Sequence, residues 1–246
     1  MENDAPARKT SDEERFHEDY YSYFESPENS TRYTPTASFL DHTFKHESFS
    51  VLDLGCGNAA LSQYLPERCD YWGVDHSEFA IERCLKRYPN RKFVAQDLLS
   101  FLIQLAAENK KFDVVVMAGL LFYNVDKETA QRKDDQEIVQ FCLDNIISDQ
   151  RYLSIIVPFC YGDHPSHSLF VRAESLQKLV KEMLRTAQAK IVYENLSLQI
   201  GLDERVRQQK VAPDWFVSNS YADYSSIFIG TYMASWTFIA SPKSNS

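Results

Sequence analysis

Two glycines and two carboxylates stand at spacings that suit the binding of a nucleoside. Gly55 and Gly57 follow the apolar run 51–54, and glycine allows a positive φ and lets a ligand approach with no Cβ in the way. Asp75 ends a second apolar run about 20 residues later, the spacing expected of an acid that binds both hydroxyls of a ribose. Asp53 lies within that first run, two residues before Gly55. Together these residues predict a ligand site that accepts a nucleoside.

Asp53 distinguishes between two classes of nucleoside ligand. A dinucleotide would place a pyrophosphate against the glycine turn, where a fixed carboxylate would repel it. S-adenosylmethionine instead brings a sulfonium and an ammonium, which a carboxylate attracts. The third glycine of the dinucleotide pattern is replaced by Ala60, a change that the pattern tolerates. The sequence therefore favours S-adenosylmethionine over NAD as the cofactor.

Residues 51–57, Val-Leu-Asp-Leu-Gly-Cys-Gly, resemble the first motif of the class I S-adenosylmethionine-dependent methyltransferases. The specific likeness lies within 51–124, and the order of strands and helices is similar over about 45–240. The resemblance implies an α/β, Rossmann-like fold of the small-molecule methyltransferase type. It has a seven-stranded, mostly parallel sheet with helices on both faces, an antiparallel last strand and a small N-terminal lid.

Alternating apolar runs and helical stripes supply the elements that must position these residues. Asn58 suits the N-cap of a short helix over about 59–65, and Ser77 suits the N-cap of the helix 77–88. The charged stretch 126–137 is typical of a solvated loop and helix start. Strands are predicted at 51–54, 71–75, 91–94, 112–117, 151–158, 190–196 and 226–239, and further helices at 98–107, 138–146 and from about 168 to 184.

The chain divides into a tail, a cap and one main domain. Residues 1–15 are charged and are predicted to form a mobile tail. Residues 16–48 are aromatic-rich and predict two short helices broken near Ser26 and Pro27; these aromatics either cover the cofactor or pack against the edge helices. The methyltransferase domain spans 49–246, with 201–225 as an insertion that we expect to cover the substrate pocket.

The resemblance also implies roles for residues at the carboxyl ends of the strands. Asp97 would accept the adenine amino group beside the Leu98 N–H, and it equally suits the N-cap of the helix 98–107. Tyr21 and Arg32 are candidate donors to the methionine carboxylate. The predicted cofactor residues are Asp53, Leu54, Gly55, Gly57, Asp75, His76, Gln96, Asp97, Leu98, Met117, Ala118, Tyr21 and Arg32, and the predicted substrate residues are Tyr123, Asn124 and Trp215.

His164 and His167 are the candidate catalytic bases. Methyl transfer is an in-line displacement, and a hydroxyl acceptor needs a group that removes its proton, whereas a carboxylate acceptor does not. Imidazole titrates near the working pH. The alternative is that each is a surface loop histidine or a helix cap. With Asp163 the two histidines lack a further metal-type ligand, so no metal site is predicted.

The net charge and the cysteine content limit the kinds of partner that the protein can have. The net charge of −9 over 246 residues opposes binding to a phosphate backbone, so the expected acceptor is a small molecule and not nucleic acid. Five cysteines without C-x-x-C spacing indicate free thiols in the cytoplasm. No signal peptide or membrane-spanning run is visible. A monomer or homodimer is expected.

The predicted function is O-, N- or carboxyl methylation of a small molecule, in specialised metabolism. Two alternatives stay open. A methyltransferase-like binding or assembly module without catalysis is opposed by the intact acids and glycines. An NAD-dependent oxidoreductase is opposed by Asp53.

Overall fold

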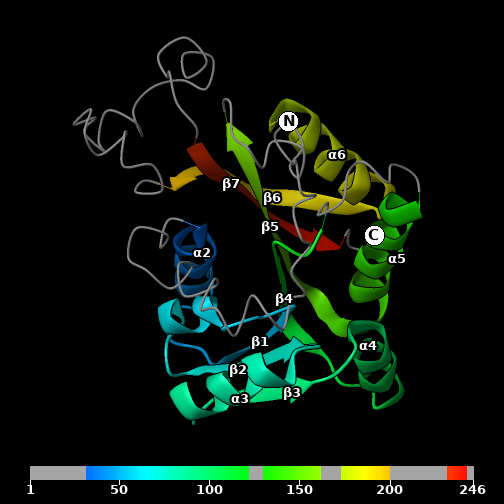
Figure 1. Cartoon of the computed structure of the whole chain (residues 1–246). Coiled ribbons are helices and arrows are strands. Elements are labelled where there is room, and N and C mark those ends of the chain that lie inside the picture. The colour runs from blue at the N-terminus through cyan, green and yellow to red at the C-terminus, as the bar shows by residue number, and fades with distance from the viewer. Residues whose placement is uncertain (1–31, 122–129, 162–172, 200–231, 243–246) are drawn as a thin grey trace, which may run out of the picture.

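A computed structural model describes residues 32–121, 130–161, 173–199 and 232–242 and shows one sheet between two layers of helices (Figure 1). The sheet has seven strands in the order β3-β2-β1-β4-β5-β7-β6. The strands are β1 (Phe49–Leu54), β2 (Cys69–Asp75), β3 (Lys92–Ala95), β4 (Phe112–Ala118), β5 (Ile147–Tyr161), β6 (Ala189–Gln199) and β7 (Tyr232–Pro242). The helices are α2 (Thr34–Phe44), η3 (Ala60–Tyr64), α3 (Glu78–Arg87), α4 (Leu98–Ala107), α5 (Ala130–Phe141), η4 (Cys142–Ile146) and α6 (Ala173–Thr186).

The direction of the strands confirms the predicted fold class. β3, β2, β1, β4 and β5 pair in parallel, whereas β7 lies antiparallel between β5 and β6. The chain builds outward from β1 to β3 and then returns to β4 on the other side of β1. Such a reversal opens a crevice at the carboxyl ends of the two central strands, where open α/β sheets bind their ligands.

Each face of the sheet carries its own apolar core. Alternating side chains of β1 point to opposite faces, so that Leu52 and Leu54 pack with α4, α5 and α6, whereas Val51 packs with α2, η3 and α3. Figure 1 shows these two sets of helices on opposite sides of the sheet. Because β4 is buried on both faces, Val114, Val115 and Val116 have no exposed surface, as expected of a central parallel strand.

Within the described residues the predicted strands and helices are present, with differences that include those at β5, α5 and η3. β5 runs over Ile147–Tyr161 instead of 151–158, because Ile147 pairs with Phe112 of β4 and residues 159–161 continue the pairing with β7. α5 already begins at Ala130, inside the charged stretch expected to be loop and helix start. η3 is a 3₁₀ helix whose N-cap is Ala59 with φ of 54°, so the prediction that Asn58 caps it is wrong.

The cap segment is described in part. α2 corresponds to the second of its two predicted helices, and Pro35 stands in its first turn, where a missing N–H has no cost. The first helix and the tail 1–15 lie outside the described residues, as do 201–225. Among the helices that the structure does describe, none is both long and apolar enough to cross a membrane.

Candidate functional site

The glycine turn after β1 is held against the end of β2. Gly55 and Gly57 have φ of 67° and 51°, values that an L side chain rarely adopts. The N–H groups of Gly55 and Cys56 donate to the Val74 carbonyl at 2.9 and 3.0 Å. The Gly57 N–H donates to Asp75 Oδ2 at 2.9 Å. The turn and the acid, 18 residues apart in sequence, therefore form one unit.

Asp75 is fixed by backbone donors. The Ser77 N–H donates to Asp75 Oδ1 at 3.0 Å, and His76 Nδ1 lies 3.4 Å from the same oxygen. The carboxylate is 8% exposed. Since each ionised carboxylate oxygen can accept two hydrogen bonds, Asp75 keeps acceptor capacity for the two hydroxyls of a ribose.

Asp53 lies buried beneath the turn. The Tyr71 hydroxyl donates to Asp53 Oδ2 at 2.6 Å, whereas Oδ1 has no hydrogen-bond partner among the described residues. Burial raises the pKa of Asp53 from 3.8 to about 7; the Tyr71 hydrogen bond and the Arg32 charge lower the pKa, and the Asp75 charge raises it. An uncompensated buried carboxylate is costly, so this oxygen calls for a cationic or donating ligand.

Two further buried polar groups adjoin the same turn. Asn58 Oδ1 and Nδ2 and Ser62 Oγ have no hydrogen-bond partner in the part of the chain that the structure describes. A buried polar group left without a partner costs about 1–3 kcal/mol. A polar ligand bound over the turn could form hydrogen bonds with these side chains and with Asp53 Oδ1. Sequence reasoning missed Ser62 and Tyr71, and assigned Asn58 to a cap.

β2 and β3 end side by side, with Asp75 opposite Ala95. The Gln96 N–H donates to the Asp75 carbonyl at 2.9 Å. Asp97 Oδ1 accepts from the Ser100 N–H and from the Ser100 hydroxyl, both at 2.9 Å. These hydrogen bonds lower the pKa of Asp97 and make it the N-cap of α4, as predicted. Asp97 is exposed, so the cap leaves the carboxylate accessible to an adenine.

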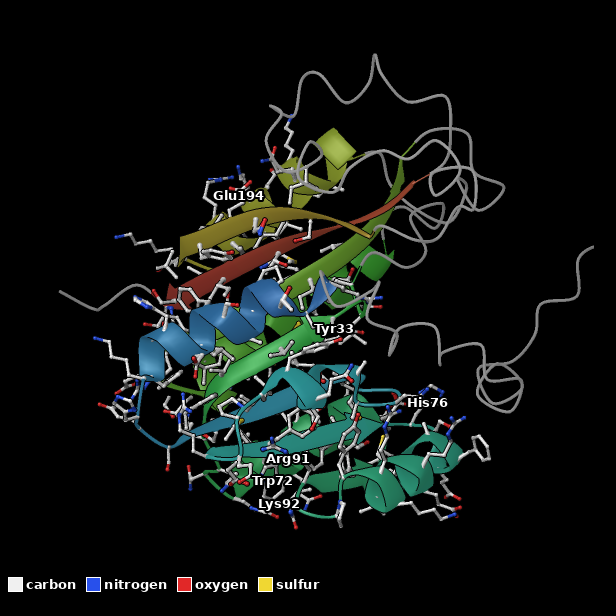
Figure 2. All side chains as sticks on the ribbon, turned by 90° about the vertical axis from the view of Figure 1, so that its left-hand side faces the viewer. Tyr33, Trp72, His76, Arg91, Lys92 and Glu194 are labelled. Carbon is white, nitrogen blue, oxygen red and sulfur yellow. The ribbon has the colours of Figure 1, made fainter. Side chains whose placement is uncertain are left out.

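The remaining described candidates divide between core and rim. Leu54 and Met117 have no exposed surface and pack in the core below the turn, whereas Ala118 is half-buried. Arg32 is buried, and its guanidinium lies 5.5 Å from the centre of the Tyr33 ring. Figure 2 shows Tyr33, at the start of α2, and His76, after β2, on the same side of the molecule.

Six predicted residues lie outside the described ranges. The described residues hold no group of three or more histidines, cysteines or acids placed to bind a metal, and Asp163 is not among them. The six residues are Tyr21, Tyr123, Asn124, His164, His167 and Trp215.

The turn also depends on a glycine within β2. A Cβ built on Gly73 would lie 2.8 Å from Cys56 Sγ and 2.9 Å from the Phe93 ring. Gly73 thus leaves the space that the Cys56 side chain fills. The Cys84 thiol, from α3, donates to the Gly57 carbonyl at 3.2 Å, so the turn is packed from the strand and from the helix.

Gly73→Ala is therefore expected to lower the free energy of unfolding by about 1–3 kcal/mol through overpacking. Chemical denaturation measures the change. Adding Cys56→Ala should restore part of the loss, because it removes the sulfur that the new methyl group meets. Strict additivity of the two substitutions would contradict this packing.

Comparison with known proteins agrees with the geometry. Residues 51–133 match the family model described as a methyltransferase domain. A putative methyltransferase of Invertebrate iridescent virus 6, 235L, is 28% identical over 102 residues. That alignment covers 40% of this chain and 37% of the viral protein, so the chain matches less than half of its relative's length.

Two solved structures share the fold over nearly the whole chain. NodS, an N-methyltransferase from Bradyrhizobium japonicum WM9 solved with S-adenosylhomocysteine, has a TM-score of 0.55 at 15% identity, covering 92% of this chain and 93% of NodS. The plantazolicin methyltransferase BpumL, solved with a pentazolic desmethylPZN analog and S-adenosylhomocysteine, has a TM-score of 0.53 at 16% identity. The alignment covers 95% of this chain and 92% of BpumL.

The family match begins at β1 and includes the glycine turn, Asp75 and Asp97. The predicted resemblance to the S-adenosylmethionine-dependent methyltransferases is thereby confirmed, and the neighbours solved with S-adenosylhomocysteine agree with the predicted cofactor. Residues 51–133 thus match a methyltransferase domain, and the fold of the chain is that of the class I S-adenosylmethionine-dependent methyltransferases.

Proposed function

We propose that the protein methylates a small molecule, at an oxygen, a nitrogen or a carboxylate, with S-adenosylmethionine as the methyl donor. The observation that carries the proposal is the buried Asp53 before the glycine turn, whose Oδ1 has no hydrogen-bond partner among the described residues. A negative charge at this point suits a cationic ligand and opposes a diphosphate. NodS and the plantazolicin methyltransferase, which share the fold, support a small-molecule acceptor.

The described residues suggest which part of the cofactor each would hold. Asp75 would accept the ribose hydroxyls while its backbone bonds keep it in place. Asp97 and the Leu98 N–H would meet the adenine. Asp53 would bind the ammonium group of the methionine end, and Arg32 would bind its carboxylate. When bound, S-adenosylmethionine supplies a methyl group on a positively charged sulfur.

The protein would then hold the acceptor in line with that methyl group and exclude water. We propose His164 or His167 as the base that takes a proton from a hydroxyl acceptor. Tyr123, Asn124 and Trp215 remain proposed acceptor contacts, and 201–225 the proposed cover of the pocket.

We further propose that the acceptor is not nucleic acid, since the net charge is −9 and like charges repel. Four cysteines among the described residues are free and buried, which suits a reducing cytoplasm. A monomer or homodimer is the proposed assembly.

Titration calorimetry with S-adenosylhomocysteine, followed by transfer of a labelled methyl group to panels of phenols, amines and carboxylic acids, tests the proposal. Binding with no transfer to any panel would favour a module without catalysis. Binding of NAD with no affinity for S-adenosylhomocysteine would revive the oxidoreductase.

Asp75→Ala is expected to weaken S-adenosylhomocysteine binding by about 1–3 kcal/mol, because the ribose hydroxyls lose their charged acceptor. Calorimetry measures the loss. Asp70→Ala is the matched control, because Asp70 lies on the same strand but is exposed and pairs with Lys92 at 2.8 Å. Equal affinity of the Asp75 variant and the wild type would remove Asp75 from the site.

A further inference from the structure

Tyr71 and Asp53 form a buried pair that the binding motif alone does not explain. Tyr71 lies on β2, is 1% exposed, and its hydroxyl donates to Asp53 Oδ2 at 2.6 Å. This short bond holds Oδ2 against the Tyr71 hydroxyl. Oδ1 is then left without a partner among the described residues.

The groups that act on Asp53 come from each element around it. Arg32, before α2, contributes a positive charge, and Asp75, at the end of β2, a negative charge. The Cys56 thiol of the turn and the Cys84 thiol of α3 both lie in the electrostatic surroundings of Tyr71. From β4 the residue opposite Asp53 is the apolar Val116. Among these groups, Arg32 is the cation that favours the ionised form of Asp53.

We propose that Tyr71 is a positioning residue, which aims Asp53 Oδ1 at the cationic amino-acid end of the cofactor, so that cofactor binding is coupled to the loss of a proton from Asp53. This inference rests on the proposed function. The proton leaves the carboxyl group for the solvent as the cationic ligand arrives. No other bond forms or breaks.

The direction of the pH dependence follows from the charges. Near neutral pH the ligand-free Asp53 is partly protonated, and only its ionised form attracts a cation. Affinity should therefore rise with pH until Asp53 is ionised. Tyr71 donates to the ionised form and favours it, so removing the hydroxyl should move this rise to higher pH.

Tyr71→Phe tests the inference, because phenylalanine fills the same space without the hydroxyl. S-adenosylmethionine and S-adenosylhomocysteine are titrated calorimetrically into the full chain from pH 5.5 to 9, a range set by the ordinary and raised values of the acid. We expect the midpoint of the rise in affinity to shift to a pH about one unit higher. One pH unit corresponds to roughly the free energy of one hydrogen bond to a charged group. Affinity then falls about fivefold at pH 7 and stays within about twofold at pH 9.

Two controls separate positioning from structure. Tyr193→Phe makes the same change on β6, at the opposite edge of the sheet from β3, and should leave the profile unchanged. Asp53→Asn should remove the Asp53-dependent rise. The ligand's own titration is common to all variants and cancels in the ratio of their affinities to that of the wild type.

A Tyr71→Phe affinity reduced by the same factor at every pH would show a structural role only and overturn the inference, as would an unchanged profile. Titration in two buffers of different ionisation enthalpy gives the second readout. The wild type should release a fraction of a proton at pH 7, and no release would also overturn the coupling. If the wild type binds neither ligand at any pH, the proposed function itself fails.

Discussion

Asp53→Asn is expected to stabilise the ligand-free protein at pH 8 while it weakens the binding of S-adenosylmethionine. Burial, first of all, raises the pKa of Asp53 from 3.8 to about 7. The folded state thus holds the proton more tightly than the unfolded chain, and this stabilisation, complete below the unfolded pKa, is lost as the pH rises through 7. About three pKa units at 1.36 kcal/mol each give an upper limit of roughly 4 kcal/mol.

Asparagine escapes this loss because it is neutral at every pH. Its side-chain oxygen can still accept the Tyr71 hydrogen bond. We expect the free energy of unfolding of the variant to exceed that of the wild type by about 1–4 kcal/mol at pH 8, and the difference to shrink toward pH 4. Urea denaturation at several pH values measures both.

Asp70→Asn is the matched control for this prediction. Partial burial raises the pKa of Asp70, but hydrogen bonds from Lys92 and Trp72 outweigh it, so that the net shift is downward. The sign of the pH effect should therefore be reversed, with the wild type gaining stability as Asp70 ionises. An Asp53 variant that is no more stable than the wild type at pH 8 would contradict the raised pKa.

The cofactor experiment gives the other half of the result. Since the variant lacks the negative charge that meets the cationic ligand, S-adenosylmethionine should bind at least about tenfold more weakly at pH 8, as expected for a lost bond to a charged group. A stabilised protein with reduced affinity would mark Asp53 as a residue retained for function at a cost in stability. Equal affinity would remove the electrostatic argument for the donor.

Gly57→Val is expected to abolish cofactor binding. Gly57 has φ of 51°, which a β-branched residue does not adopt without strain. Its N–H also donates to Asp75 Oδ2, so a rearranged turn would release the ribose acid. We expect S-adenosylhomocysteine affinity to fall at least about a hundredfold, measured by calorimetry on protein that melts cooperatively.

Asn109→Val provides a control for the strain alone. Asn109 has the same φ of 51°, but it follows α4 at the end remote from Asp97 and is exposed. The two variants should lose similar thermal stability, whereas only Gly57→Val should lose the ligand. A Gly57 variant that folds and binds normally would show that the turn does not touch the cofactor.

The local parts of the site could be predicted from the order of the residues. Gly55 and Gly57 were identifiable because their positive φ values suit few other residues. Ser77 and Asp97 were identifiable as caps, since a cap bonds to an N–H three residues away and needs nothing distant. The apolar run of β4 likewise predicted a strand that is buried on both faces.

Contacts between side chains of neighbouring strands could not be predicted in this way, because they depend on how the chain folds. Tyr71 meets Asp53 because β1 and β2 pair in parallel with Asp53 opposite Gly73, and no spacing rule specifies which side chain crosses that gap. The extension of β5 to Tyr161 depends on β7, whose paired residues lie more than 70 positions later in the chain. Ala59, and not Asn58, takes the N-cap position of η3. The side chains of Asn58 and Ser62 are buried without a hydrogen-bond partner among the described residues. Local preferences did not indicate this arrangement, because the shape of the turn depends on its packing against β2 and α3.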